Sequence, residues 1–88
     1  MARRHSLDYE PVFSSQALEV FLSLSKARQR KLAKVAYALA APPFREPDYH
    51  TKDSTGRLLS NVRVDGFIFT YWLDRSPMEL RIVDLVEL

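Results

Sequence analysis

Residues 57–74 decide the fold, and they read RLLSNVRVDGFIFTYWLD. Two runs rich in β-branched and aromatic residues flank Asp65-Gly66 in this stretch. A type I′ turn needs positive φ at both central positions, and Asp-Gly between two such runs favours it, so we predict a β-hairpin. A two-residue turn also determines which residues pair across the hairpin.

This pairing gives the hairpin two different faces. The first face is predicted to hold Val64 with Phe67, Val62 with Phe69, Ser60 with Tyr71 and Leu58 with Leu73. The second is predicted to hold Arg63 with Ile68, Asn61 with Thr70, Leu59 with Trp72 and Arg57 with Asp74. The first face is almost wholly apolar and belongs to a core. The second is half polar, which makes it a candidate binding surface.

A short strand and two helices are predicted before the hairpin. Apolar and polar residues alternate at about 6–11, which predicts a strand that Pro11 restricts to an edge. Ser14-Ser15 offers an N-cap for a helix over 16–24, and Ser25 caps a second helix that ends at Pro42-Pro43. The predicted apolar stripes are Leu18, Phe21 and Leu22 in the first helix, and Leu32, Val35, Ala36, Leu39 and Ala40 in the second.

Three further segments complete the predicted sheet. A loop at 44–48 leads into a short strand at 49–52 and a turn at 53–56. A second turn at 74–77 leads into a last strand at about 79–87. Strict alternation would place Leu80, Ile82, Asp84 and Val86 on one face of that strand, and its apolar residues on both faces predict an interior position. The predicted fold is α+β, in the order β-α-α-β-β-β-β, with a mostly antiparallel sheet and a helix pair on one face.

Composition restricts the class of protein. The 88 residues include no cysteine and two histidines, so we predict no disulfide, metal site or cofactor. No apolar run approaches the roughly 20 residues that span a bilayer. The basic start at residues 2–5 is followed by Asp8 and Glu10 rather than by an apolar segment, so no signal peptide is expected. We therefore expect a cytoplasmic protein of one domain, residues 1–88, with no membrane partner.

Charge is distributed unevenly along the chain. Residues 26–63 hold nine cations and three acids, although the net charge of the whole chain is only +2. Five of these cations, at positions 26, 28, 30, 31 and 34, crowd the first half of the second helix with no acid among them. The basic middle suggests an anionic partner, and a solvated helix face is the alternative.

The order of elements, together with Gly56-Arg57 and the run from Arg63 to Asp74, resembles the RelE/ParE superfamily of type II toxin–antitoxin toxins. The resemblance extends over nearly the whole chain. It implies a five-stranded sheet whose first strand lies beside the last, and an antitoxin partner. RelE-like members cleave mRNA on the ribosome, whereas ParE-like members poison DNA gyrase, so both activities remain open at this point.

For mRNA cleavage, a 2′-hydroxyl attacks the adjacent phosphate, which requires a general base, a general acid and cations. Arg63 matches the family's strand arginine, and Lys52 lies where RelE-like nucleases place basic residues. The candidate catalytic residues are Arg63, Lys52 and His50. The candidate substrate-binding residues are Arg57, Asn61, Arg81, Trp72, Lys31 and Lys34.

Two departures from the family pattern favour a protein that does not cleave RNA. Ile68 stands where the family often has a second arginine. RelE-like nucleases usually carry a tyrosine or histidine just after the last strand, where this sequence has Val86-Glu87-Leu88. Acid–base chemistry would then have to come from elsewhere, with His50 or Glu87 as candidates. The favoured prediction is nevertheless a toxin that acts as a metal-independent, ribosome-dependent mRNA endoribonuclease. The alternative is a gyrase inhibitor, or a degenerate toxin that only binds its antitoxin.

Overall fold

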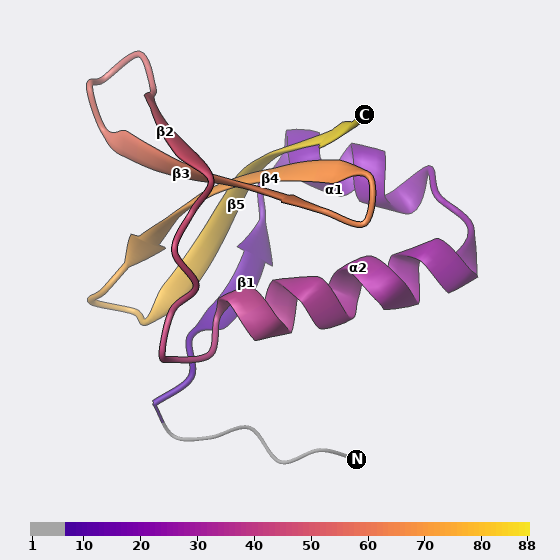
Figure 1. Cartoon of the computed structure of the whole chain (residues 1–88), viewed down its shortest axis with the longest axis horizontal. Helices are drawn as coiled ribbons and strands as arrows, with labels where there is room; N and C mark the ends of the chain where they lie inside the picture. Colours follow the sequence, from indigo (N-terminus) through magenta and orange to yellow (C-terminus); the bar gives the residue numbers. More distant parts are fainter. Residues whose placement is uncertain (1–6) are drawn as a thin grey trace.

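The computed structural model describes residues 7–88 and consists of a five-stranded sheet with two helices (Figure 1). The elements are β1 (Glu10–Phe13), α1 (Ser15–Leu22), α2 (Lys26–Leu39), β2 (Tyr49–Lys52), β3 (Leu58–Val64), β4 (Phe67–Asp74) and β5 (Glu79–Glu87). This order confirms the predicted β-α-α-β-β-β-β arrangement. The basic start at residues 2–5 lies outside the described residues, as does position 6 of the first predicted strand.

The strands follow the order β1-β5-β4-β3-β2, in which β1 is parallel to β5 and all other neighbours are antiparallel. The first strand therefore lies beside the last, as the resemblance implied, and Pro11 occupies an edge strand. The prediction of a strand over 6–11 was wrong in its bounds. The N–H of Tyr9 donates to the carbonyl of Ala40 rather than to a strand, and pairing with β5 begins only at Glu10.

The Asp-Gly hairpin forms with the predicted register over five residue pairs, from Val64–Phe67 to Ser60–Tyr71. Asp65 has φ 53° and Gly66 has φ 79°, as a type I′ turn requires. The three expected pairs beyond Ser60–Tyr71 were wrong, because the pairing of β3 with β4 ends there. Leu58 pairs with β2 instead and is 56% exposed. The arm formed by β2 and β3 consequently projects away from the turn between β4 and β5 (Figure 1).

The core lies between one face of the sheet and the two helices. Its fully buried side chains include Val62, Phe67, Phe69, Leu80 and Ile82 from the sheet. Burying each such side chain stabilises the fold by roughly 1.5–3 kcal/mol. The helices contribute Ala17, Leu32, Ala36 and Leu39 to the same cluster.

The predicted apolar stripe of α2 is confirmed, but that of α1 was wrong in two positions. Leu18 and Leu22 are 40% and 59% exposed, whereas Ala17 is fully buried. The hydroxyl of Ser14 accepts the N–H of Ala17, as expected of an N-cap, and the Phe21 ring packs against Phe13. These contacts rotate α1 so that Leu18 and Leu22 face outward. Neither helix in the described part of the chain is long and apolar enough to cross a membrane.

A register shift in β5 changes which of its residues face the core. Thr70 pairs with Asp84 but Tyr71 pairs with Ile82, so Val83 is an extra residue in a β-bulge. Leu85 is consequently 1% exposed in the core, and Asp84 lies on the opposite face. The hydroxyl of Ser14 donates to the carbonyl of Val83 at 3.0 Å. The prediction of β5 as an interior strand is confirmed, but strict alternation was wrong beyond Ile82.

Candidate functional site

The sheet face turned away from the helices is the candidate functional surface, and we call it the open face. Directly paired residues project on the same side of a sheet, so the strand register assigns side chains to this face. One row across the four strands β2, β3, β4 and β5 consists of Tyr49, Asn61, Thr70 and Asp84. The next row consists of Arg63, Ile68 and Val86.

A hollow of about 450 Å³ occupies the middle of the open face. Its lining residues are Gln16, Tyr49, Thr51, Leu59, Asn61, Ile68, Thr70, Val83, Asp84 and Val86. No lysine, arginine or histidine is among them, and the only carboxylate is that of Asp84. A phosphate group in this hollow would meet no cation in the lining itself, whereas apolar and amide groups of a protein segment would find matching surfaces.

Asn61, a predicted substrate-binding residue, is buried in the floor of this hollow with 3% of its surface exposed. Its side-chain oxygen accepts the hydroxyl of Thr70 at 2.7 Å. Its amide nitrogen donates to the hydroxyl of Thr51 at 3.0 Å and to the carbonyl of Tyr49 at 3.4 Å. The Asn61 amide therefore joins β3 to both neighbouring strands, and its hydrogen-bonding groups are used within the sheet.

Trp72, Arg57 and Arg81 come together at one end of the open face. The guanidinium of Arg57 lies over the Trp72 ring at 3.9 Å from its centroid, and that of Arg81 at 6.0 Å. Arg81 also contacts Asp74 at 3.0 Å and Glu79 at 2.7 Å. Because the Trp72 ring is covered and the Arg81 charge is paired, this cluster offers neither an open stacking platform nor an unpaired phosphate clamp.

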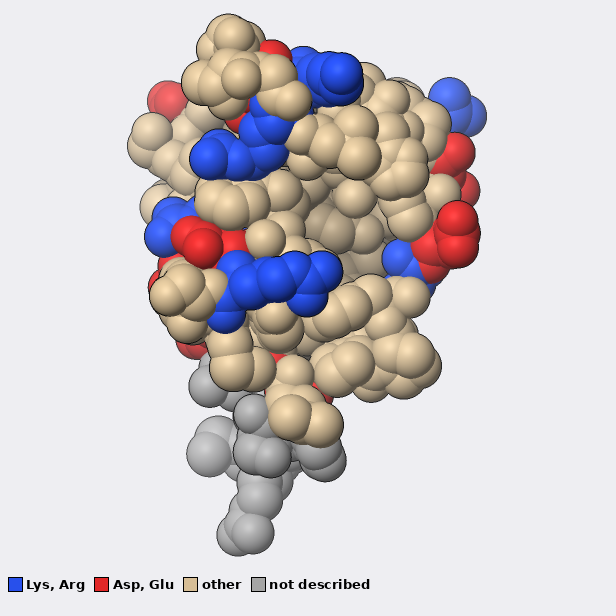
Figure 2. Space-filling view, turned by 90° about the vertical axis from the view of Figure 1, so that its left-hand side faces the viewer, with Lys and Arg blue, Asp and Glu red and all other residues tan. Residues whose placement is uncertain are grey.

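Arg57 is further engaged with the turn between β2 and β3. Its guanidinium is 3.6 Å from a carboxylate oxygen of Asp53. Hydrogen bonds from Thr55 and from the Arg57 backbone, together with the Arg57 charge, hold the pKa of Asp53 below its usual value. Figure 2 faces this turn and the turn between β4 and β5, and it shows basic side chains interspersed with acidic ones rather than one continuous basic surface.

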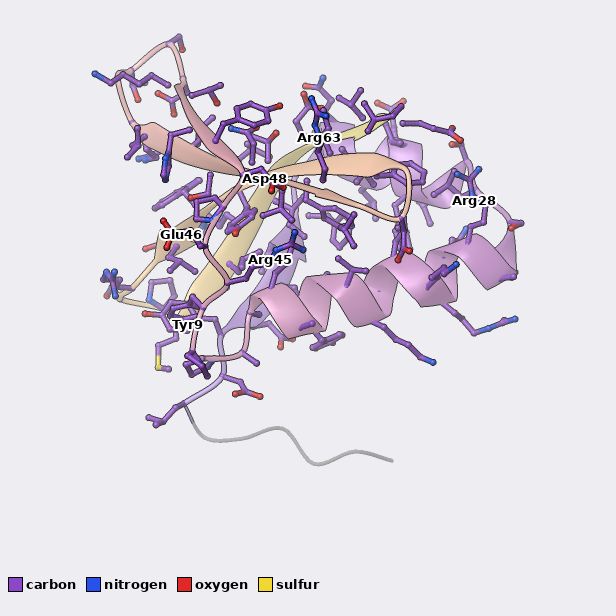
Figure 3. All side chains as sticks on the ribbon, viewed as in Figure 1. Tyr9, Arg28, Arg45, Glu46, Asp48 and Arg63 are labelled. Carbon is purple, nitrogen blue, oxygen red and sulfur yellow. The ribbon has the colours of Figure 1, made fainter. Side chains whose placement is uncertain are left out.

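Arg63 is a predicted catalytic residue that lies on the open face and remains available for a ligand. It is exposed beside the hollow, opposite Ile68. Its backbone N–H donates to the Asp48 carboxylate at 2.7 Å, and Figure 3 shows Asp48 close to this part of β3. Its guanidinium has no ion pair or hydrogen bond with any residue between 7 and 88.

The other two predicted catalytic residues lie on the opposite side of the sheet. His50 pairs with Ser60 and Lys52 pairs with Leu58, so both project toward the helix side, in contrast to Arg63. Both are exposed. The structure therefore does not bring Arg63, Lys52 and His50 together around one phosphate group.

Lys31 and Lys34 are exposed on α2, which packs on the other side of the sheet from the hollow. Within α2, Arg28 is engaged, because it contacts Glu87 at 2.8 Å and lies over the Phe67 ring. Glu87, considered above for acid–base chemistry, is thus paired on the helix side. Lys26, Arg30 and Lys34 form an i, i+4, i+8 series in which each like-charged pair destabilises the helix by about 0.2–0.5 kcal/mol.

Tyr71 is buried on the helix side of the sheet, in the same row as Ser60 and His50. Burial raises the pKa of its phenol, the Arg45 charge lowers it and the Asp48 charge raises it. The phenol therefore stays protonated over a wider pH range than an exposed tyrosine. This state suits a structural role for Tyr71.

Sequence reasoning missed Tyr49, Thr51 and Asp84 as residues of the hollow. The predicted turn at 53–56 did not determine the register of 49–52 against β3, and the bulge in β5 reversed the expected orientation of Asp84. In the described part of the chain, no three His, Asp or Glu side chains are grouped to hold a metal ion.

The strand order, the parallel pairing of the first and last strands and the helix pair define a RelE-like α+β fold. Comparison with solved structures supports this class. The chain is similar to a chain of the toxin–antitoxin complex RelBE2 from Mycobacterium tuberculosis, with a TM-score of 0.71 and 15% sequence identity over 92% of this chain and 99% of that one. Comparisons with protein-family models and with curated proteins found no match. The predicted resemblance is confirmed at the level of the fold.

Proposed function

We propose that this chain is a single-domain, toxin-type component of a toxin–antitoxin pair, and that it acts by binding protein rather than by cleaving RNA. The observation that carries the second part is the hollow on the open face, whose lining includes no cation. The fold likeness to a chain of the RelBE2 toxin–antitoxin complex supports the first part.

Catalysis of RNA cleavage needs its groups around one phosphate, and the candidates here are dispersed. His50 and Lys52 lie on the opposite side of the sheet from Arg63. Arg57 and Arg81 are engaged with Trp72 and with nearby carboxylates. A general base, a general acid and a charge-stabilising cation act only when they reach the reacting atoms together.

The expected partner is an antitoxin that places an apolar and acidic segment on the open face. Leu59, Ile68 and Val86 provide apolar surface in the hollow, and the unpaired guanidinium of Arg63 beside it suits an acidic side chain. An extended or helical segment with alternating apolar and acidic residues would satisfy both features.

Co-purification tests this partner directly. The tagged chain is expressed together with the product of the short reading frame beside its own gene. Val86→Glu places a carboxylate in the hollow at a site that is 45% exposed, so the fold should persist while an acidic partner is repelled. His50→Glu adds the same charge on the other side of the sheet and serves as the matched control.

We expect the wild type and His50→Glu to retain the partner and Val86→Glu to lose at least about 90% of it, which corresponds to roughly 1.4 kcal/mol of binding free energy. If both variants retain the partner equally, the partner does not bind at the open face. If no neighbouring product binds the wild type, the proposal of a toxin–antitoxin pair fails.

A second candidate, a ribosome-dependent endoribonuclease, is favoured by one observation. The Arg63 guanidinium is exposed and unpaired among the described residues, as a phosphate-binding arginine would be. Inhibition of DNA gyrase is a further form of the protein-binding function, and DNA breaks after induction of the chain would identify it.

A further inference from the structure

The outward side of α2 is a second charged surface, separate from the open face. Lys26, Arg30 and Lys34 lie at i, i+4 and i+8, with Lys31 beside them, and all four are exposed. None of the four has an ion pair with any residue in the described range 7–88. Figure 3 shows long side chains extending from α2 on the side away from the sheet.

Folding alone does not explain this arrangement. The four cations lie on the side opposite the buried Leu32, Ala36 and Leu39. The first turn of α2 contains no acid, although the helix dipole favours one there. The sequence contains no acid between Glu19 and Glu46 that could offset the repulsion locally. A series of like charges that weakens its own helix indicates an anionic partner.

We infer that the outward side of α2 binds the phosphate backbone of double-stranded DNA. Three of the four exposed cations are lysines, which are depleted in protein–protein interfaces but common at phosphates. Proteins that bind single-stranded nucleic acid stack its bases on aromatic side chains. The exposed side of α2 carries one aromatic residue, Tyr37, which follows the cations, so a duplex suits this surface better than a single strand.

The dimensions of α2 fit this ligand. Lys26 to Lys34 extends over about 12 Å of helix, since each residue rises about 1.5 Å. One strand of a DNA duplex presents roughly three or four phosphates over that length. The major groove of B-form DNA admits an α-helix, whereas the deep, narrow groove of an RNA duplex does not. Figure 1 shows that no other helix or strand of the described residues covers the outer side of α2.

The test measures binding of the purified full chain to a fluorescent 20-base-pair DNA duplex by anisotropy, between about 50 and 200 mM NaCl. One variant carries Lys26→Gln, Arg30→Gln and Lys34→Gln, which keeps residues compatible with a helix. The control carries Ser54→Glu, Arg75→Gln and Ser76→Glu in two exposed turns, which also lowers the net charge by three, from +2 to −1.

We expect the α2 variant to bind about tenfold or more weakly at 50 mM NaCl, with a salt slope smaller by about 2 to 3, and the control to stay within about threefold of the wild type. The α2 variant should unfold at or above the wild-type midpoint, because it removes like-charge repulsion within the helix. If the α2 variant does not fold, the single substitutions Arg30→Gln and Lys34→Gln replace it, and each should reduce the slope by about 1.

Three results would overturn the inference. The first is absence of wild-type binding to the DNA duplex at 50 mM NaCl. The second is an equal loss of binding in the two triple variants, because net charge alone would then explain it. The third is tighter binding to an RNA duplex of the same length, or to poly-glutamate, than to the DNA duplex. None of these results depends on the proposed antitoxin, so the two proposals fail separately.

Discussion

Asn61 holds the centre of the open face together, because its amide contacts both neighbouring strands. A buried amide without partners is costly, and each of its side-chain hydrogen bonds ends on a specific hydroxyl or carbonyl. This network explains how a polar residue can be almost fully buried on the sheet face that is turned away from the helices.

Replacing Asn61 with alanine should lower the free energy of unfolding by about 1–3 kcal/mol, because Thr51 and Thr70 lose their partner in a partly buried site. Chemical denaturation measures this change. Arg63→Ala, two residues along the same strand but exposed, should change stability by less than about 0.5 kcal/mol. Equal effects of the two substitutions would contradict the structural role of Asn61.

Tyr71 should make the protein lose stability at alkaline pH. Its pKa is raised in the folded chain, so above the unfolded pKa of about 10 the unfolded chain releases the phenolic proton while the folded chain keeps it. The folded state then binds more protons, and the free energy of unfolding falls as pH rises.

Tyr71→Phe removes this proton from both states. The decline of unfolding free energy between about pH 9.5 and 11 should therefore be shallower in Tyr71→Phe than in the wild type, when each is measured by denaturation across that range. Parallel declines in the two proteins would show that Tyr71 does not carry the effect.

At the scale of elements, β5 shapes both faces of the sheet through its bulge. The extra residue, Val83, turns Leu85 into the core and Asp84 into the hollow. Without the bulge, strict alternation would bury Asp84 and expose Leu85, so a single extra residue changes both the core and the candidate site.

Leu85→Ala should cost about 2–5 kcal/mol of unfolding free energy, because it leaves a cavity beneath β4 and β5. Val86→Ala, at the adjacent and half-exposed position, should cost less than about 1 kcal/mol. Thermal or chemical denaturation of these two variants distinguishes a β5 with the bulge from a β5 with unbroken alternation. A larger cost for Val86→Ala would mean that the alternation continues unbroken.

The elements that could be predicted from the sequence are those with local signals. Asp65-Gly66 determined a hairpin, Ser14 and Ser25 determined helix starts, and Pro42-Pro43 marked a helix end. The bulge at Val83 and the divergence of β3 from β4 depend on contacts with β1, β2 and α1, which no local pattern contains. Asn61 likewise looked available because its two threonine partners lie on different strands.

At the scale of the whole molecule, the charges separate into surfaces with different roles. The open face combines a hollow without cations and one unpaired arginine, whereas the outward side of α2 carries four unpaired cations among the described residues. The first surface suits a protein segment and the second suits a polyanion. The predicted catalytic set remains a prediction, and its members are distributed over both sides of the sheet.

Mapping of transcript 5′ ends in a host within minutes of inducing the chain is the most direct test of a binding function against RNA cleavage. We expect growth to slow without new 5′ ends, in the wild type and in Arg63→Ala alike, because the predicted acid–base residues His50 and Glu87 lie on the opposite side of the sheet from Arg63. Cleavage at defined positions that disappears in Arg63→Ala would contradict this expectation and would establish the open face as a nuclease site.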